Sequence, residues 1–342
     1  MKEYTFPSYP KMSDRTEQWH LDEKEWRQLS AMNWAVTEKI HGANFCFVAT
    51  KEDIFCAKRK SILAPEDDFF GYKRVREKLI VKVQQLFNEL RVDHETLDRL
   101  FIYGELFGGS YPHEDVPVVA GLEAVQTGIH YCPDLEFCVF DLAWDIEGNF
   151  SFFSFEKTIE VCQKHELFHA VPLFCGTFQE CLDYEIGFDS TVPQALGLPP
   201  LPIANTAEGV VIRPLSNVLV KTSKGLRRPL LKRKIPQFSE DARYKGSQKK
   251  ERKNFVPAMD LLEWRMLELM TEQRLDNVLS KTGRLTEENL AEVTRELLED
   301  IWEELSISEA SALSSISNEE RALLNSVLED EAKELVLARK NG

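Results

Sequence analysis

The hydrophobic pattern of this 342-residue chain changes near residue 242, and no other feature constrains the fold as strongly. Before that point, apolar residues come in short runs such as Trp34–Lys39, Asn44–Thr50 and Ile54–Lys58, which indicate strands. After it, Leu, Met and Val recur at three- and four-residue steps, which indicates amphipathic helices. We therefore predict an α+β chain with an antiparallel-sheet domain over residues 1–241 and a small all-α domain over residues 242–342.

Individual elements can be placed from the same pattern. We expect Trp34–Lys39 and Asn44–Thr50 to be neighbouring strands of a hairpin, joined by the turn Ile40–Ala43. Ser317 followed by Glu320 fits a capping box at a helix start. The predicted helices are Gly71–Leu90, Phe155–His165, Met259–Val278, Thr286–Leu305 and Ser317–Leu337.

Charge is distributed unevenly along the chain. The formal net charge of -15 argues by itself against a nucleic-acid partner. However, the segment from Lys221 to Lys253 is densely basic, whereas the chain from Thr286 onward is dominated by Glu and Asp. An acidic protein can still bind nucleic acid if its cations gather on one surface. We therefore interpret the acidic helices as solvated faces and the basic segment as a functional surface.

The sequence also carries signals of compartment. No apolar run approaches the roughly 20 residues that span a bilayer, and the first 20 residues lack the apolar core of a secretory signal. The seven cysteines contain no CxxC pair. We therefore expect free thiols in a reducing intracellular compartment, most simply the cytoplasm, and no membrane partner.

The segment Glu38-Lys39-Ile40-His41-Gly42-Ala43-Asn44 is the first candidate for chemistry. A lysine at the end of a strand places an amine at the mouth of a pocket, and Gly42 would permit a positive φ and close approach of the backbone to a ligand. A buried lysine near other cations becomes a nucleophile. Taken alone, the pattern fits an ordinary hairpin with an exposed lysine equally well.

Further segments follow in a definite order. They are Cys56-Ala-Lys-Arg-Lys60 with Pro65–Tyr72, Tyr103-Gly-Glu-Leu-Phe-Gly108, Phe137-Cys-Val-Phe-Asp141, Thr206-Ala-Glu-Gly-Val-Val-Ile-Arg-Pro214, and Leu231-Lys-Arg-Lys234 ending in Phe238-Ser-Glu240. Together these motifs resemble those of covalent nucleotidyltransferases, above all the RNA ligase 2 family of phage-type nick-sealing and kinetoplastid RNA-editing ligases. The resemblance covers nearly the whole chain. It implies an antiparallel nucleotidyltransferase (ATP-grasp-like) domain.

The resemblance also implies roles for individual residues. Lys39 would be the nucleophile that forms a lysyl-AMP bond with ATP, and Lys232 and Lys234, on one face of a strand, would stabilise charge on the transferring phosphoryl group. Glu208 would organise lysine and metal, a Mg²⁺ ion held directly or through water. The expected contacts to the nucleotide are Glu38, Lys39, Ile40, His41, Asn44, Arg59, Glu105, Phe140, Glu208, Arg213, Lys232 and Lys234. Within this set, Phe140 would stack on the adenine, Glu105 would face the ribose and Glu38 would fix the adenine edge through its backbone.

One position departs from the family pattern. Many phage members have Lys at the end of the EG-x-x-x-K motif, where this chain has Arg213. Positive charge is kept, but a guanidinium does not behave as an ammonium at a phosphate. The departure affects the geometry of the phosphate site and leaves the reaction class unchanged.

We therefore predict an ATP- and Mg²⁺-dependent RNA ligase that joins 3′-OH and 5′-phosphate ends, at nicks in duplex RNA. The contacts to RNA would come from scattered cations such as Arg265, Arg274 and Lys281 and from the basic entry, Lys245, Lys249, Lys250, Arg252 and Lys253. Two alternatives remain. One is a DNA ligase or a capping-type nucleotidyltransferase, against which the helical tail argues. The other is a non-catalytic RNA-end-binding protein on the same fold, against which the intact lysines argue.

Overall fold

The computed structural model describes residues 6–93, 95–222, 225–235 and 269–341, together with residues 238, 259, 262 and 265–267. The chain divides into two compact units, Met1–Ile235 and Pro236–Gly342. The predicted boundary at residue 242 falls outside the described residues, and so does the basic cluster Lys249–Lys253. Both therefore stay predictions.

A four-stranded antiparallel sheet forms one half of the first unit. Its strand order is β11-β8-β1-β7, from β11 (Leu231–Lys234), β8 (Gly209–Pro214), β1 (Trp34–Glu38) and β7 (Pro172–Gly176). One face packs against η1 (Thr16–Trp19), α1 (Glu23–Ser30) and α4 (Phe178–Leu182). At the centre of this layer, Trp34 is fully buried, with Trp19 and Phe178 beside it.

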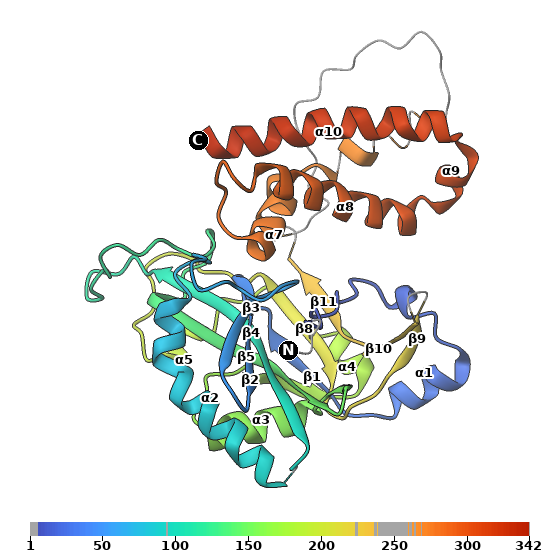
Figure 1. The fold of residues 1–342 in the computed structure, drawn as a ribbon. Helices are drawn as coiled ribbons and strands as arrows, with labels where there is room; N and C mark the ends of the chain where they lie inside the picture. Colours follow the sequence, from blue (N-terminus) through green and yellow to red (C-terminus); the bar gives the residue numbers. More distant parts are fainter. Residues whose placement is uncertain are drawn as a thin grey trace. The chain divides into compact units, whose positions relative to one another are not determined.

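A five-stranded antiparallel sheet forms the other half, in the order β3-β2-β4-β5-β6. Its strands are β3 (Ile54–Lys58), β2 (Ala43–Thr50), β4 (Leu97–Ser110), β5 (Cys132–Ile146) and β6 (Asn149–Phe152). The helices α2 (Lys73–Asp93) and α3 (Phe155–Lys164) cover one face, as Figure 1 shows, and share its apolar core. Most positions of β1 and β2 are buried, so their runs read as continuous apolar stretches without alternation.

The predicted hairpin between β1 and β2 is wrong. Both strands exist with nearly the predicted bounds, but β1 pairs with β7 and β8, whereas β2 pairs with β3 and β4. Residues 39–42 therefore cross from one sheet to the other. A short run of polar residues and a glycine looks the same in sequence whether it reverses the chain or carries it between sheets.

Small elements complete the unit. A two-stranded hairpin consists of β9 (Val220–Thr222) and β10 (Gly225–Arg227), and the proline-rich segment after residue 190 contains only the short α5 (Val192–Ala195). Near the amino terminus, Ser13 bridges β11: its amide donates to the carbonyl of Leu230 at 3.0 Å, and its carbonyl accepts from the amide of Lys232 at 2.8 Å. The beginning and the end of the unit are thus neighbours.

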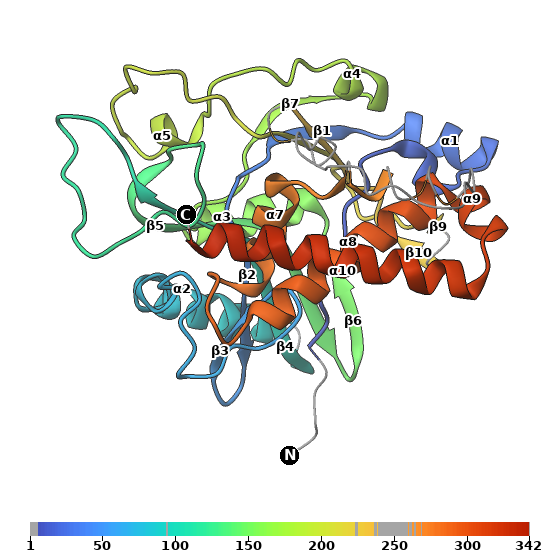
Figure 2. The same ribbon diagram turned by 90° about the horizontal axis from the view of Figure 1, so that it is seen from above.

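The second unit is helical, as predicted. Its helices include α7 (Glu272–Thr282), α8 (Leu290–Ser308), α9 (Ala310–Ser315) and α10 (Asn318–Asn341). Helices α8 and α10 lie side by side in both views of the chain (Figure 1, Figure 2). The predicted capping box of Ser317 and Glu320 is present. The helix predicted over residues 259–278 is interrupted, because Thr271 is extended and caps the start of α7.

The helical unit contains a buried ion pair. The guanidinium of Arg274, 1% exposed, donates to Asp300 at 2.5 Å. This burial contradicts the expectation that Arg274 contacts RNA. By contrast, Arg295 and Glu299 form an exposed pair at 2.9 Å, with both side chains more than half exposed.

These two pairs give a matched test of what holds the helical unit together. Asp300→Asn should lower the free energy of unfolding by about 3 kcal/mol, because it removes the counter-charge that lies 2.5 Å from the buried guanidinium of Arg274. Glu299→Gln should change it by less than about 0.5 kcal/mol, because exposed pairs contribute little. Urea denaturation followed by far-UV circular dichroism measures both. Equal changes in the free energy of unfolding for the two substitutions would show that the buried pair of Arg274 and Asp300 stabilises the unit no more than an exposed pair does.

Candidate active site

The first predicted site residue, Lys39, lies where the chain leaves the four-stranded sheet. Its amide donates to the carbonyl of Gly209 at 2.9 Å, which extends the pairing of β1 with β8 by one residue. Gly42 then allows a close approach, because a Cβ there would lie 2.2 Å from the carbonyl oxygen of Leu106. The expected positive φ is not found at Gly42. The glycine therefore fits the crossing chain against β4.

A buried carboxylate lies at the centre of the site. Glu208 immediately precedes β8, and its side chain has no exposed surface. Its Oε2 is 2.7 Å from the Nζ of Lys39 and 3.4 Å from the Nδ1 of His41, and its Oε1 is 3.0 Å from the Nζ of Lys234. The structure thus brings together four of the predicted residues from three separate segments of the chain.

The charge of Glu208 is compensated by its neighbours. Burial by itself would raise the pKa of this carboxyl. The ammonium groups of Lys39 and Lys234 and the hydrogen bond with His41 outweigh burial and hold the pKa well below its usual range. Glu208 is therefore ionised at neutral pH, which makes it a weak base and a strong orienting partner for the two amines.

Lys232 and Lys234 share one face of the sheet. In β11 they pair with Val211 and Gly209 of β8, two residues apart on each strand. Gly209 is required beside them: its φ is +145°, and a Cβ there would lie 2.0 Å from the carbonyl oxygen of Arg233. The side chain of Lys234 is 9% exposed and meets Glu208, whereas that of Lys232 is half-buried.

The facing sheet supplies two further predicted residues. Asn44 of β2 and Glu105 of β4 are directly paired. Asn44 Oδ1 is buried and forms no hydrogen bond within the described structure, so it is available to a bound ligand. Burial and repulsion from Glu208 raise the pKa of Glu105 to about 7, although Lys39 and Arg59 act in the opposite direction.

Phe140 protrudes from a β-bulge. Along β4, Tyr103 pairs with Asp141 of β5 but the next residue, Gly104, pairs with Val139, so Phe140 has no partner in the ladder. Bulges of this kind redirect a side chain and are common beside active sites. The ring of Phe140 is half-buried and contacts that of Tyr9 edge-on, with centroids 4.9 Å apart.

Arg213 lies beside Phe140 and Asp141. Its guanidinium is buried, donates to Asp141 Oδ1 at 2.5 Å and to the carbonyl of Phe140 at 2.8 Å, and stacks over Phe155. These contacts differ from the phosphate contact expected of it. A guanidinium has five donors in a planar fork, and here this fork is directed to a carboxylate and a carbonyl.

Glu38, Ile40 and His41 surround the nucleophile candidate. The carboxylate of Glu38 accepts hydrogen bonds from Ser190 Oγ at 2.6 Å and from the amide and hydroxyl of Thr191, both at 2.8 Å. Its side chain thus fixes the segment before α5, and burial raises its pKa. Ile40 is buried, and the amide of His41 donates to the hydroxyl of Tyr131 at 2.8 Å.

Several residues of this region were not found from the sequence. Tyr9, Tyr131, Ser190 and Thr191 stand in no recognisable motif, and only tertiary contacts bring them to the site. Arg228 did lie in the basic segment, but nothing distinguished it from its neighbours. The acidic Asp141 beside Phe140 was the one signal that a buried cation was needed.

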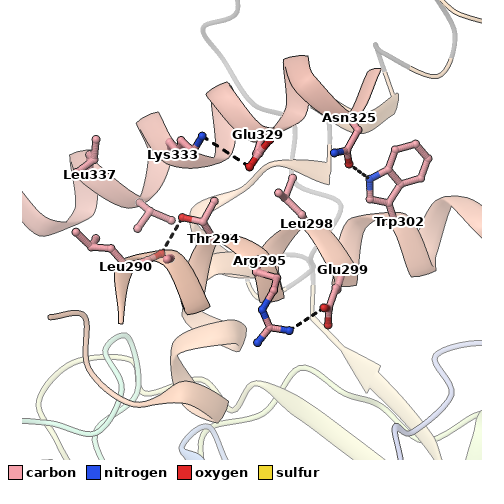
Figure 3. Close-up of a pocket in the computed structure, with 12 residues that line it drawn as sticks. Leu290, Thr294, Arg295, Leu298, Glu299, Trp302, Asn325, Glu329, Lys333 and Leu337 are labelled. Atoms are coloured by element: carbon pink, nitrogen blue, oxygen red, sulfur yellow. Dashed lines mark hydrogen bonds and ion pairs between the residues drawn. The ribbon is translucent and has the colours of Figure 1, made fainter. Parts of the chain in front are cut away.

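The helical unit has a groove of its own, of about 850 Å³, between α8 and α10 (Figure 3). Leu290, Leu298 and Leu337 line it, and Trp302 donates to Asn325 at one end. Its charged residues pair with one another, Arg295 with Glu299 and Lys333 with Glu329. None of the predicted site residues lines this groove.

Comparison with known proteins identifies the family of this chain. A family model described as RNA ligase matches residues 32–234, which include every predicted site residue, and one described as T4 RNA ligase 2 C-terminal matches residues 260–334. The chain belongs to the RNA ligase family. The predicted family resemblance is thereby confirmed.

Two similar proteins come from Trypanosoma brucei brucei. The chain is 28% identical to mitochondrial RNA-editing ligase 1 over 311 residues, which is 75% of this chain and 65% of the relative. It is 30% identical to mitochondrial RNA-editing ligase 2 over 223 residues, which is 56% of this chain and 53% of that relative. The matches thus span less than two thirds of the length of either relative.

Solved structures of a Naegleria gruberi RNA ligase are also similar. A mutant solved with AMP and Mn matches with 14% identity and a TM-score of 0.46, covering 68% of this chain and 57% of that one.

In the described part of the chain, no helix is long and apolar enough to cross a membrane.

The raised pKa of Glu105 has a measurable consequence for stability. Between pH 4.5 and 7 the unfolded chain releases this proton and the folded chain retains it, so the carboxyl destabilises the fold as pH rises through about 7. Relative to Glu105→Gln, the wild-type free energy of unfolding should fall by about 2 kcal/mol between pH 5 and pH 8. Urea denaturation at the two pH values measures this difference. If the difference in the free energy of unfolding between the two proteins were the same at both pH values, the raised pKa of Glu105 would be contradicted.

Proposed function

We propose that this protein is an ATP-dependent RNA ligase that first transfers AMP to Lys39. One observation supports this most directly: the amine of Lys39 is held 2.7 Å from a fully buried carboxylate whose other oxygen meets Lys234. An amine fixed in this way, beside further cations, suits attack on a phosphoryl group. Membership of the RNA ligase family supports the same reaction.

In the first step, Lys39 Nζ attacks the α-phosphorus of ATP. The ammonium first loses one proton to solvent, which frees its lone pair. The nitrogen–phosphorus bond then forms as the bond from the α-phosphorus to the bridging oxygen breaks and pyrophosphate leaves. A second proton passes to solvent, so one hydrogen stays on the nitrogen. Glu208 orients the amine, and Lys234 and Lys232 stabilise the negative charge that develops on the phosphoryl oxygens. The adenosine would lie on Phe140, with its sugar near Asn44 and Glu105.

Divalent metal is a further part of the proposal. Direct ligation of Mg²⁺ by Glu208 does not fit this geometry, because each of its oxygens already meets an ammonium within 3.0 Å. Among the residues described, no cluster of three His, Cys, Asp or Glu side chains could hold an ion. Mg²⁺ commonly binds through phosphates and water, and a site that enters with ATP agrees with that preference.

The later steps concern RNA. AMP would pass from Lys39 to a 5′-phosphate end, and a neighbouring 3′-hydroxyl would then displace it to close a nick in duplex RNA. The densely basic segment that begins at Lys221 supports a nucleic-acid partner, because contacts to phosphate dominate the affinity of proteins for nucleic acids.

The seven free cysteines support a reducing compartment, for which we propose the cytoplasm.

The first test is formation of a covalent adduct. Incubation with α-labelled ATP and Mg²⁺ should leave label on the denatured protein. Lys39→Ala should abolish this label, because within the described residues Lys39 provides the amine at Glu208 Oε2. Lys157→Ala, which removes an exposed lysine paired with Glu160, should leave labelling unchanged. A well-folded Lys39→Ala protein that is still labelled would overturn the assignment, and an unlabelled wild type would favour the RNA-end-binding alternative.

The second test separates the units. A fragment ending at Glu240 keeps every predicted ATP contact together with large apolar clusters of the first unit. It should therefore still form the adduct, but it should seal nicked duplex RNA at least about tenfold more slowly, because it loses cations that bind phosphate. Sealing assays on a labelled nicked duplex measure this. Unchanged sealing by the fragment would assign the helical unit another task.

A further inference from the structure

Arg228 carries a second guanidinium into the cluster behind Phe140. It follows β10 directly, and its side chain is 7% exposed. Its Nη1 donates to Asp141 Oδ1 at 2.8 Å and its Nη2 donates to Asp141 Oδ2 at 2.9 Å, so the contact with the carboxylate is bidentate. Its guanidinium also lies 3.5 Å from the centroid of the Phe152 ring.

Asp141 has two other partners, and both of them also touch Phe140. Arg213 shares Oδ1 and donates to the Phe140 carbonyl. The hydroxyl of Tyr9 donates to Oδ2 at 2.5 Å, and the ring of Tyr9 meets the ring of Phe140 edge-on. Asp141 therefore connects Arg228 to the backbone and to the side chain of the bulged residue.

Charge pairing alone does not account for Arg228. Burial would raise the pKa of Asp141, whereas Arg213 and Arg228 lower it to about 2. One arginine would neutralise the carboxylate, and the second leaves two cations facing one anion. What Arg228 adds is geometry: its planar fork fixes the orientation of both carboxylate oxygens.

We propose that Arg228 is a positioning residue for nucleotide binding, acting through Asp141 and Tyr9 to hold the Phe140 ring where a base can stack on it. This inference rests on the proposed ATP site. Arg228 reaches neither Lys39 nor Glu208 in any contact described above. It therefore affects the affinity for the nucleotide and leaves the rate of the chemical step nearly unchanged.

The neighbouring residue provides a matched control. Arg227 lies in the same hairpin and has the same charge, but it is exposed. We expect Arg228→Gln to raise the half-saturating ATP concentration for self-adenylylation about tenfold, because it loses one or two hydrogen bonds to a charged group. The rate at saturating ATP should stay within about threefold of the wild-type rate. Arg227→Gln should change both quantities less than about twofold.

Two further measurements keep the test independent of chemistry and of folding. Calorimetric titration with AMP should show weaker binding to Arg228→Gln by a similar factor, with partial recovery in Arg228→Lys. Tyr9→Phe keeps its ring and loses only the hydroxyl, so it serves if Arg228→Gln does not fold. Tyr9→Phe should weaken AMP binding about threefold. Where Arg228→Gln folds, the loss of AMP affinity in the double variant with Tyr9→Phe and Arg228→Gln should be smaller than the product of the two single losses.

The outcomes separate this inference from the proposed function. If the wild type forms no adduct and binds no AMP, the proposed function fails. If the wild type does both and Arg228→Gln matches Arg227→Gln, the positioning role fails. A loss that falls on the saturating rate alone, with AMP binding unchanged, would likewise overturn it.

Discussion

The site depends on one ion group, the buried carboxylate of Glu208 between two lysines. In the strand order β11-β8-β1, the strand that follows Glu208 is the middle one, and Lys234 and Lys39 come from its two neighbours. Removing either partner strand would take away one of the two ammonium groups that compensate this buried charge, at a cost of several kcal/mol. The pairing of these three strands therefore also determines where the amine of Lys39 lies.

A second buried carboxylate, Asp141, has a different set of partners. Arginines surround it, whereas lysines surround Glu208. The difference suits the work of each. A guanidinium keeps its proton and holds its partner through several fixed bonds, whereas an amine can lose its proton and form a new bond. In the proposed ATP site, permanent charges would hold the Phe140 ring, and exchangeable ones would lie near the phosphates.

Much of this arrangement could be predicted from the sequence, because it depends on motifs whose order is fixed along the chain. Lys39, Glu208 and Lys234 were expected together and lie together. The bounds of β2 and β3 followed from apolar runs, since burial of a strand is a local property of its residues.

Other features depend on which distant segments meet, and local pattern does not contain that information. The separation of β1 and β2 into different sheets is one example, and the contact of Tyr9 with Asp141, 132 residues away, is another. Arg213 shows a third kind of limit. Its position in the motif was recognised, but its contacts depend on a carboxylate in the other sheet.

The bridge between Ser13 and β11 has a consequence for how the molecule comes into being. Residues near the start of the first unit pair with its last strand, and that strand also brings Lys232 and Lys234. A growing chain on the ribosome therefore carries an incomplete interior until almost the whole unit has emerged, and domains fold as units during synthesis. The final strand closes the ends of the unit and compensates Glu208 in the same event. In the proposed function, a partly made protein would lack the contact of Lys234 with Glu208, because the strand that completes the fold also completes the site.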